Sequence, residues 1–259
     1  MSIFLSVAVA ILLVIIVLPA IIIIPEAFTA LNYFTFPVME FSMKWFDKFW
    51  SNVQWIQGLG RSVFLAVVSG IIATVIGTMA ALAMQKLGFR LKGGFMMLMV
   101  APMIIPVVII GASMYTVLAP LGLTNTLFGI ALAHILLGIP MVFITMSSAL
   151  SGLNPNLELA SMSMGASPVV TFLKVVMPSV KAPLIASFLF AFVTSMDEVA
   201  ATLFLSGANT KTLTIVMWEN MRTAIEPTIA VAATFLIILT LGVYILKEIG
   251  EIRSMKKYS

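Results

Sequence analysis

Two acidic residues stand side by side within one of the most apolar stretches of this sequence. Asp197 and Glu198 lie between LFAFVTSM and VAATLFL. A charge at the centre of a bilayer costs about 2.5–3.5 kcal/mol on insertion scales, so such residues usually face a protein interior or a water-filled path. Successive helical residues diverge by about 100°. We therefore expect one carboxylate to line a path and the other to bond a neighbouring helix; the alternative is that both are structural.

Few other residues could carry catalysis. The chain has no Cys, which excludes disulfides and thiolate chemistry. The one histidine, His134, cannot form a multi-histidine metal site, and it is more typical of a hydrogen-bonded packing residue than of a proton relay. The phosphate-binding pattern G-x-x-x-x-G-K-[ST] is absent. We expect a protein that is not an enzyme and carries no cofactor of its own; an intramembrane enzyme is disfavoured because no nucleophile motif accompanies His134 and the acids.

The composition predicts an integral membrane protein. Hydrophobic residues make up 61% of the 259 residues and charged residues only 9%, against roughly 25% charged in soluble domains. A spanning helix needs about 20 mostly apolar residues, and six such stretches are present. They are residues 3–24, 61–84, 95–118, 127–149, 182–205 and 228–247. The expected fold is therefore all-α, one transmembrane domain over residues 1–259, with kinks at Pro102, Pro106 and Pro140.

The basic residues predict the orientation. One set of loops and the C-terminal end carry Lys86, Arg90, Lys92, Lys174, Lys181, Lys247, Arg253, Lys256 and Lys257. The other loops carry Lys44, Lys48, Arg61, Lys211 and Arg222. By the positive-inside rule the richer side is cytoplasmic, which places both termini inside the cell. The first segment lacks a basic start and has too long an apolar run for a signal peptide, so we interpret it as a retained span.

Aromatic residues mark the long outer segment 25–60. Phe41, Trp45, Phe49 and Trp50 recur at helical spacing there, which is typical of a helix lying on the outer leaflet. A platform for substrate or partner is the alternative. In the second outer loop, Glu219 and Glu226 could attract a cation, although loop acids are more often solvated.

The segment NPNLELASMSMGASPVVTFLKVVMPSV, residues 154–180, contains two short helices between two spans. Asn154-Pro155 and Ser167-Pro168 are each typical of a helix start, and Gly165 can end the first helix. We predict helices over 155–164 and 168–177 with a turn at Gly165–Ala166. Apolar side chains beyond the needs of a solvated loop favour a partner surface. They are Leu159, Met162, Met164, Val169, Phe172 and Val175.

This segment resembles the EAA motif of permease subunits of ABC importers, which reads Glu-Ala-Ala, three residues, Gly, nine residues, Ile, one residue, Leu-Pro. The chain has Glu158-Leu159-Ala160, Gly165, Val175 and Met177-Pro178 at that spacing, with Leu159 as the main departure. The resemblance implies a MetI-like fold and coupling helices that dock on a separate ATPase subunit. The coupling residues that it implies are Glu158, Ala160, Gly165, Ala166 and Pro178.

Further stretches resemble permeases of the spermidine/putrescine (PotC-like) type, among them FTFPVMEFSMKWFDKFWSN and SMDEVAATLFLSGANTKTLTIVMWENMR. This resemblance implies an inner-membrane protein and a polyamine-type cargo. It also implies three kinds of partner: two ATPase subunits that bind ATP and Mg, a second permease, and an extracytoplasmic binding protein. Two alternatives stay open: an ion-coupled secondary transporter using Asp197 or Glu198, and an ABC permease for ferric ion, phosphonate, opine or an amino-acid-like cargo.

Overall fold

The computed structural model describes the backbone of residues 2–258 and the side chains of that range except 2–4, 89, 243 and 246–258. The predicted cytoplasmic side chains of Lys247, Arg253, Lys256 and Lys257 therefore lie outside the described residues. Within the described backbone the regular elements are helices, as predicted. They are α1 (Ser2–Glu26), α2 (Lys44–Ser51), α3 (Val53–Lys86), α4 (Phe89–Ile104), α5 (Val107–Leu118), α6 (Leu127–Ser151), α7 (Asn156–Ser163), α8 (Pro168–Thr171), the π-helical η1 (Phe172–Val176), α9 (Met177–Ser179), α10 (Lys181–Asp197), α11 (Ala200–Leu205), α12 (Leu213–Thr223) and α13 (Thr228–Tyr258).

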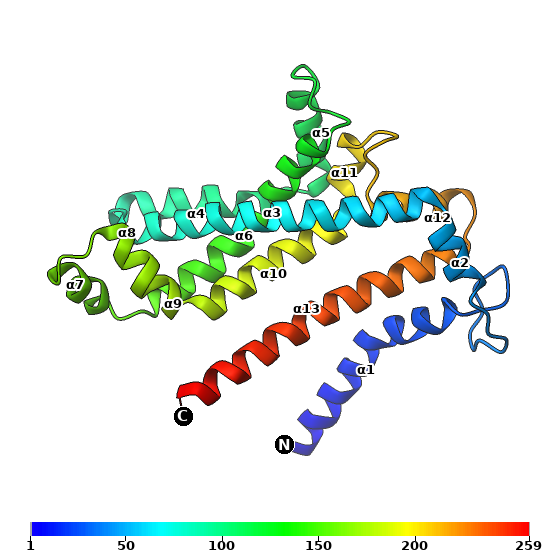
Figure 1. Ribbon diagram of the computed structural model, residues 1–259, viewed down its shortest axis with the longest axis horizontal. Coiled ribbons are helices and arrows are strands. Elements are labelled where there is room, and N and C mark those ends of the chain that lie inside the picture. The colour runs from blue at the N-terminus through cyan, green and yellow to red at the C-terminus, as the bar shows by residue number, and fades with distance from the viewer. Residues whose placement is uncertain (1, 259) are drawn as a thin grey trace.

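Helices α3, α6 and α10 form the central bundle, and α13 and α1 slant away from it (Figure 1). Small residues let the bundle helices approach closely, as is common where lipid removes the hydrophobic drive for association. At Gly77 of α3, an added Cβ would lie only 2.6 Å from Cγ1 of Val142 on α6. Ala73 and Ala191 are likewise fully or almost fully buried between these helices. The three helices are therefore packed tightly against one another.

The described residues contain three helices long and apolar enough to cross a membrane, α1, α3 and α6, or up to five spans if each of two bent helix pairs counts as one. The span predicted over 95–118 is broken beside Pro106, one of its two predicted kinks. Helices α4 and α5 meet at an angle of 100°, and the intervening Ile105 is extended. Pro106 explains this break, because proline lacks the N–H of the helical ladder and clashes with the preceding turn.

The predicted span over 182–205 is also discontinuous. Helix α10 ends at Asp197, Glu198 has an extended backbone, and α11 begins at Ala200. Helices α5 and α11 pack side by side and stand away from the bundle (Figure 1). Gly111 permits this contact, since a Cβ there would lie 2.8 Å from the Cα of Ala201.

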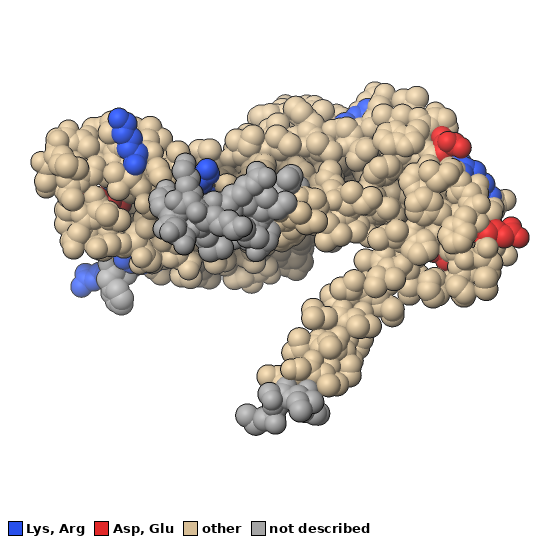
Figure 2. Space-filling view, turned by 60° about the horizontal axis from the view of Figure 1, so that its bottom comes forward, with Lys and Arg blue, Asp and Glu red and all other residues tan. Residues whose placement is uncertain are grey.

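On the face seen in Figure 2, charged side chains lie mostly toward the two ends of the long axis, and few are visible on the surface between them. Helix α1 extends from this body as an arm (Figure 2), and its 22 residues from Leu5 to Glu26 have a mean hydropathy of 3.5, with Glu26 as the one charged residue. This distribution suits a body whose middle lies in hydrocarbon and whose ends lie in water.

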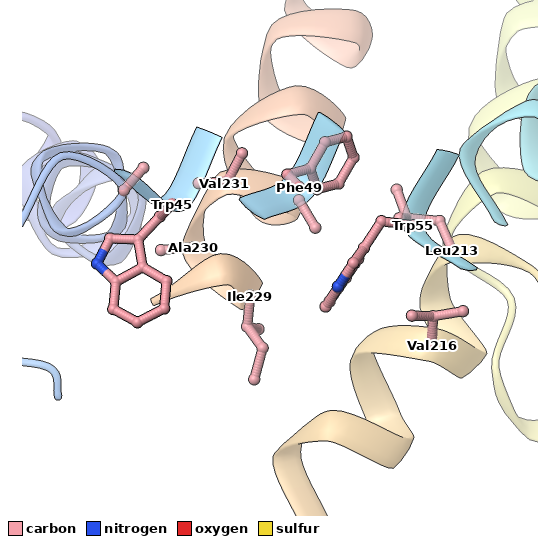
Figure 3. Close-up of a cluster of buried hydrophobic side chains, with 10 residues drawn as sticks. Trp45, Phe49, Trp55, Leu213, Val216, Ile229, Ala230 and Val231 are labelled. Carbon is pink, nitrogen blue, oxygen red and sulfur yellow. The ribbon is translucent and has the colours of Figure 1, made fainter. Parts of the chain in front are cut away.

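The end opposite α7 is closed by a cluster of aromatic and aliphatic side chains from α2, α3, α12 and the start of α13 (Figure 3). Trp45 and Phe49 of α2 are buried in it, while Phe41 and Trp50 are exposed. The stripe on α2 thus packs partly against protein, and contact of its exposed side with the outer leaflet stays a prediction. Apolar residues recur at the helical spacing whether a helix packs on protein or lies on lipid, so the spacing alone does not distinguish the two.

Candidate functional site: the elbow and the break

The first site is the elbow, defined here as residues 154–180. Asn154 Oδ1 accepts a hydrogen bond of 3.0 Å from the N–H of Asn156 at the start of α7. Gly165 has a φ of +88°, which ends α7, and Ser167 caps α8 by accepting from the N–H of Val170 at 3.4 Å. The predicted turn between two capped helices is therefore confirmed, with α7 spanning 156–163.

A buried hydrogen bond holds the two arms of the elbow together. The hydroxyls of Ser161 on α7 and Thr171 on α8 lie 3.0 Å apart, and both side chains are almost fully buried. Two hydroxyls that satisfy each other in this way fix one relative placement of the helices, because any other would leave a polar group unpaired. The sequence analysis missed this pair, and a lone Ser and Thr ten residues apart give no local signal.

The second arm runs further than predicted. Helix α8 continues through η1 and α9 to Ser179, so Pro178 lies within the last turn instead of ending the helix at residue 177. The π-helical segment contains the bond from the N–H of Met177 to the carbonyl of Phe172. The wider π-turn explains how the missing N–H of Pro178 is accommodated. After Ser179 the chain bends by 81° into α10.

The elbow presents an apolar surface. Met164 is 84% exposed and Val169 66% exposed, and Leu159 and Met162 are exposed as well. Phe172 and Val175, which were expected on this surface, are half-buried instead, and Phe172 packs against the end of the bundle. Contiguous exposed apolar side chains of this kind mark interaction sites.

The motif residues lie around this surface. Ala160, Gly165 and Pro178 are exposed, and Glu158 and Ala166 are half-buried. Glu158 stands in the first turn of α7, where the helix dipole favours a negative charge. It also lines a cavity of about 530 Å³ between the elbow and the ends of α3, α4 and α6, together with Lys92 and Gln85. The elbow is thus joined to the bundle mainly through η1 and α9, with open space behind α7.

The second site is the break, defined here as residues 197–199. Asp197 is exposed at the end of α10. Glu198 is half-buried, and its Oε1 accepts a hydrogen bond of 2.7 Å from the N–H of Ala201 in the first turn of α11. The two carboxylates therefore have different surroundings, but the 100° helical spacing from which we expected this does not apply, because Glu198 is extended. Which of them meets a cargo stays a prediction.

His134 of α6 lies directly beside the break. It is 1% exposed; its Nδ1 lies 2.6 Å from Ser195 Oγ and its Nε2 lies 2.8 Å from Thr202 Oγ1. The prediction of a hydrogen-bonded packing residue is confirmed. Thr214 of α12 also reaches this point, donating to the carbonyl of Glu198 at 3.1 Å.

The outer acids are paired with lysines. Glu226 lies 2.5 Å from Lys48 of α2, and Glu219 lies 2.6 Å from Lys211. Each lysine partly cancels the negative charge of its partner, so Glu219 and Glu226 attract a cation less strongly than unpaired acids would. Among the described side chains, no three of the types His, Asp and Glu lie close enough together to hold a metal ion.

Known proteins are similar to this chain in sequence. The chain is 26% identical over 209 residues to the spermidine/putrescine transport system permease protein PotC of Haemophilus influenzae, covering 81% of each chain. It is 28% identical over 203 residues to the putrescine transport system permease protein PotI of Escherichia coli, covering 76% of this chain and 72% of PotI.

Solved structures share the fold. A bacterial ABC transporter involved in import of the acidic polysaccharide alginate has a TM-score of 0.70 at 16% identity, covering 95% of both chains. The methionine ABC transporter MetNI has a TM-score of 0.63 at 17% identity, covering 74% of this chain and 92% of that one. The family model described as binding-protein-dependent transport system inner membrane component matches residues 73–251. This chain therefore belongs to the family of inner-membrane components of binding-protein-dependent transport systems.

Proposed function

We propose that this chain is a permease subunit of an ABC importer, that it forms half of a translocation path with a second permease, and that separate ATPase subunits drive it through the elbow. The observation that carries the proposal is the elbow itself. It is a capped, internally bonded pair of short helices that holds Glu158, Gly165 and Pro178 at the motif spacing and exposes apolar side chains at one end of the bundle.

The connection between elbow and bundle supports a mechanical role. The second arm leads through Val180 directly into α10, which packs on α3 and α6 and ends at the break. A displacement of the elbow by an ATPase subunit would therefore be passed to α10 as a rigid rod. Rotation of packed helices between two arrangements is a common way in which transporters alternate access.

The cargo that we propose is a small cation of the polyamine type. The relatives PotC and PotI carry spermidine/putrescine and putrescine transport in their names, and the exposed carboxylate of Asp197 lies at a helix break within the bundle region. A carboxylate beside a path attracts cations and repels anions. A less similar relative, a probable molybdenum ABC transporter permease protein of Haloferax volcanii, is 27% identical over 168 residues, so an oxyanion is a useful competing cargo in the test.

The orientation that we propose puts the elbow in the cytoplasm. Lys92, Lys174 and Lys181 lie at or beside the elbow end, where the positive-inside rule expects basic residues. The outer end would then be formed by α2 and α12 and would meet an extracytoplasmic binding protein.

The test is reconstitution. The tagged chain is co-expressed with the transport proteins encoded beside it, purified, and placed in proteoliposomes with labelled putrescine, spermidine or molybdate. We expect copurification of an ATPase and uptake of a polyamine only when ATP and binding protein are supplied. Uptake driven by an ion gradient without ATP would instead indicate a secondary transporter, and ATP-driven molybdate uptake would overturn the cargo.

A further inference from the structure

We propose that His134 is the clasp across the break: it ties α10 to α11, so that a movement of the elbow reaches the Asp197–Glu198 pair and α5. The inference rests on the proposed transport function and deepens it by naming a positioning residue. His134 itself lies in the first half of α6, is 1% exposed, and bonds to Ser195 and Thr202 instead of to any elbow residue.

The first step is that the break needs a link other than the helix. Extended backbone at Glu198 interrupts the ladder of α10, and α11 is only six residues long. The helical hydrogen-bond ladder therefore does not by itself connect α11 to α10. Any displacement of α10 would be absorbed at residues 198 and 199 unless something bridged the gap.

The second step is that His134 spans this gap. Ser195 lies on α10 before the break and Thr202 lies on α11 after it, and the two ring nitrogens of His134 reach one hydroxyl each, at 2.6 and 2.8 Å. Ser195 is 3% exposed and Thr202 is 0% exposed. Water therefore does not compete for these bonds, and opening either would leave a buried polar group without a partner.

The third step assigns direction to the bonds. The Thr202 hydroxyl lies 3.3 Å from the carbonyl oxygen of Glu198, which can only accept. If its one proton is donated there, the Thr202 oxygen accepts from the Nε2–H of His134, and Nδ1 accepts from the Ser195 hydroxyl. The result is a chain of donors running from α10 through His134 to the backbone of Glu198, in which each bond polarises the next.

The fourth step carries the link outward. The carbonyl of Glu198 also accepts from Thr214 of α12, and the Glu198 side chain holds the first turn of α11. Helix α11 in turn packs on α5 at Gly111. The clasp therefore joins the driven rod to the elements around the break.

Variants that remove one of the two hydrogen bonds of His134 test whether the clasp joins α10 to α11. Ser195→Ala opens the α10 side, Thr202→Val opens the α11 side with little change of shape, and Thr202→Ser keeps the hydroxyl. The matched control is Thr194→Val. Thr194 lies on α10 next to Ser195, but its hydroxyl donates to the carbonyl of Phe190 within that helix and does not cross the break. Each variant is reconstituted with its full complex, and polyamine taken up per ATP hydrolysed is measured beside ATPase assembly.

We expect Ser195→Ala and Thr202→Val to lower the uptake per ATP on the order of tenfold, the size expected when a buried polar group loses its partner. ATPase assembly should stay intact, and Thr202→Ser and Thr194→Val should transport like the wild type. Loss of assembly in the first two variants would make the pair merely structural and overturn the proposal. Unchanged uptake per ATP would also overturn it, whereas a wild-type complex that takes up no polyamine would contradict the proposed function instead.

The distance between α10 and α11 across the break gives a second test, because a purely structural role of the clasp would not change how this distance responds to nucleotide. Because this chain has no Cys, spin labels at Ile185→Cys on α10 and Leu203→Cys on α11 report on the break; both positions are about two-fifths exposed. With the clasp intact, we expect one narrow distance before and after nucleotide trapping. In Thr202→Val the distribution should broaden on trapping; an unchanged narrow distribution would overturn the clasp.

Discussion

Gly165→Ala is the substitution that isolates the shape of the elbow from its surface chemistry. The φ of Gly165 is +88°, and a Cβ added there would meet nothing within 4 Å. The new methyl group therefore adds no clash, and its whole cost is the left-handed backbone, about 1–2 kcal/mol for an L-residue. That cost is comparable to the net worth of the Ser161–Thr171 hydrogen bond, about 0.5–1.5 kcal/mol. The ratio of correctly folded to misfolded elbow should therefore fall by a factor of roughly 5–30.

The assay is ATP-dependent polyamine uptake into proteoliposomes, divided by ATP hydrolysed in the same vesicles. We expect several-fold less uptake per ATP with normal amounts of permease in the membrane. Gly88→Ala is the matched control, because Gly88 has a φ of −64° and equally open surroundings at the same end of the bundle. Wild-type uptake per ATP in Gly165→Ala, with the control also normal, would refute the claim that elbow geometry couples ATP hydrolysis to transport.

Three further substitutions test other parts of the molecule. Gly111→Leu should lower thermal stability and uptake, because the new side chain meets the backbone of Ala201 at 2.8 Å and overpacking typically costs about 1–3 kcal/mol. Asp197→Asn should raise the KM for putrescine with little change in ATPase assembly, measured by uptake at varied binding-protein-loaded cargo. Phe49→Ala should lower the melting temperature of the detergent-purified chain, since emptying a buried phenylalanine site costs about 3–5 kcal/mol.

Each of these has its own control on this chain. Gly93→Leu adds the same side chain in open space on α4, so equal losses in both glycine variants would remove the packing explanation. Glu219→Gln neutralises an acid already paired with Lys211; an equal rise in KM there would mean that general charge, and not Asp197, is responsible. Phe41→Ala removes an exposed ring, and a melting temperature lowered as much as in Phe49→Ala would contradict the cluster.

The elbow was predictable because its signals are local. Proline after Asn154 and Ser167, and glycine at 165, dictate where helices start and stop whatever surrounds them. The end of the second arm was missed by two residues, since the π-helical segment that accommodates Pro178 has no sequence signature. The apolar runs likewise located the three helices α1, α3 and α6 that are long enough to span, because their length and composition reflect the bilayer and not the partners of each helix.

The break could not be predicted, because its causes are tertiary. Residues 194–202, TSMDEVAAT, contain neither proline nor glycine, and the helix is interrupted where bonds from α6 and α12 converge on it. Pro106 predicted a bend between α4 and α5, but the bend angle of 100° depends on the packing of α5 against α11. The aromatic spacing on α2 does not tell whether the helix faces lipid or protein. The positions of α12 and α13 show that Trp45 is buried against protein.

The central claim is that the elbow is where an ATPase subunit acts, and one cross-linking measurement tests it most directly. The chain has no Cys, so Met164→Cys, at a position 84% exposed on the elbow, and Met39→Cys, at a position 80% exposed at the opposite end, are unique thiols of comparable accessibility in this chain. In membranes holding the complete complex, a short thiol-directed cross-linker should join Met164→Cys to the ATPase subunit and leave Met39→Cys free of it. An ATPase adduct at Met39→Cys, or none at Met164→Cys, would contradict the assignment.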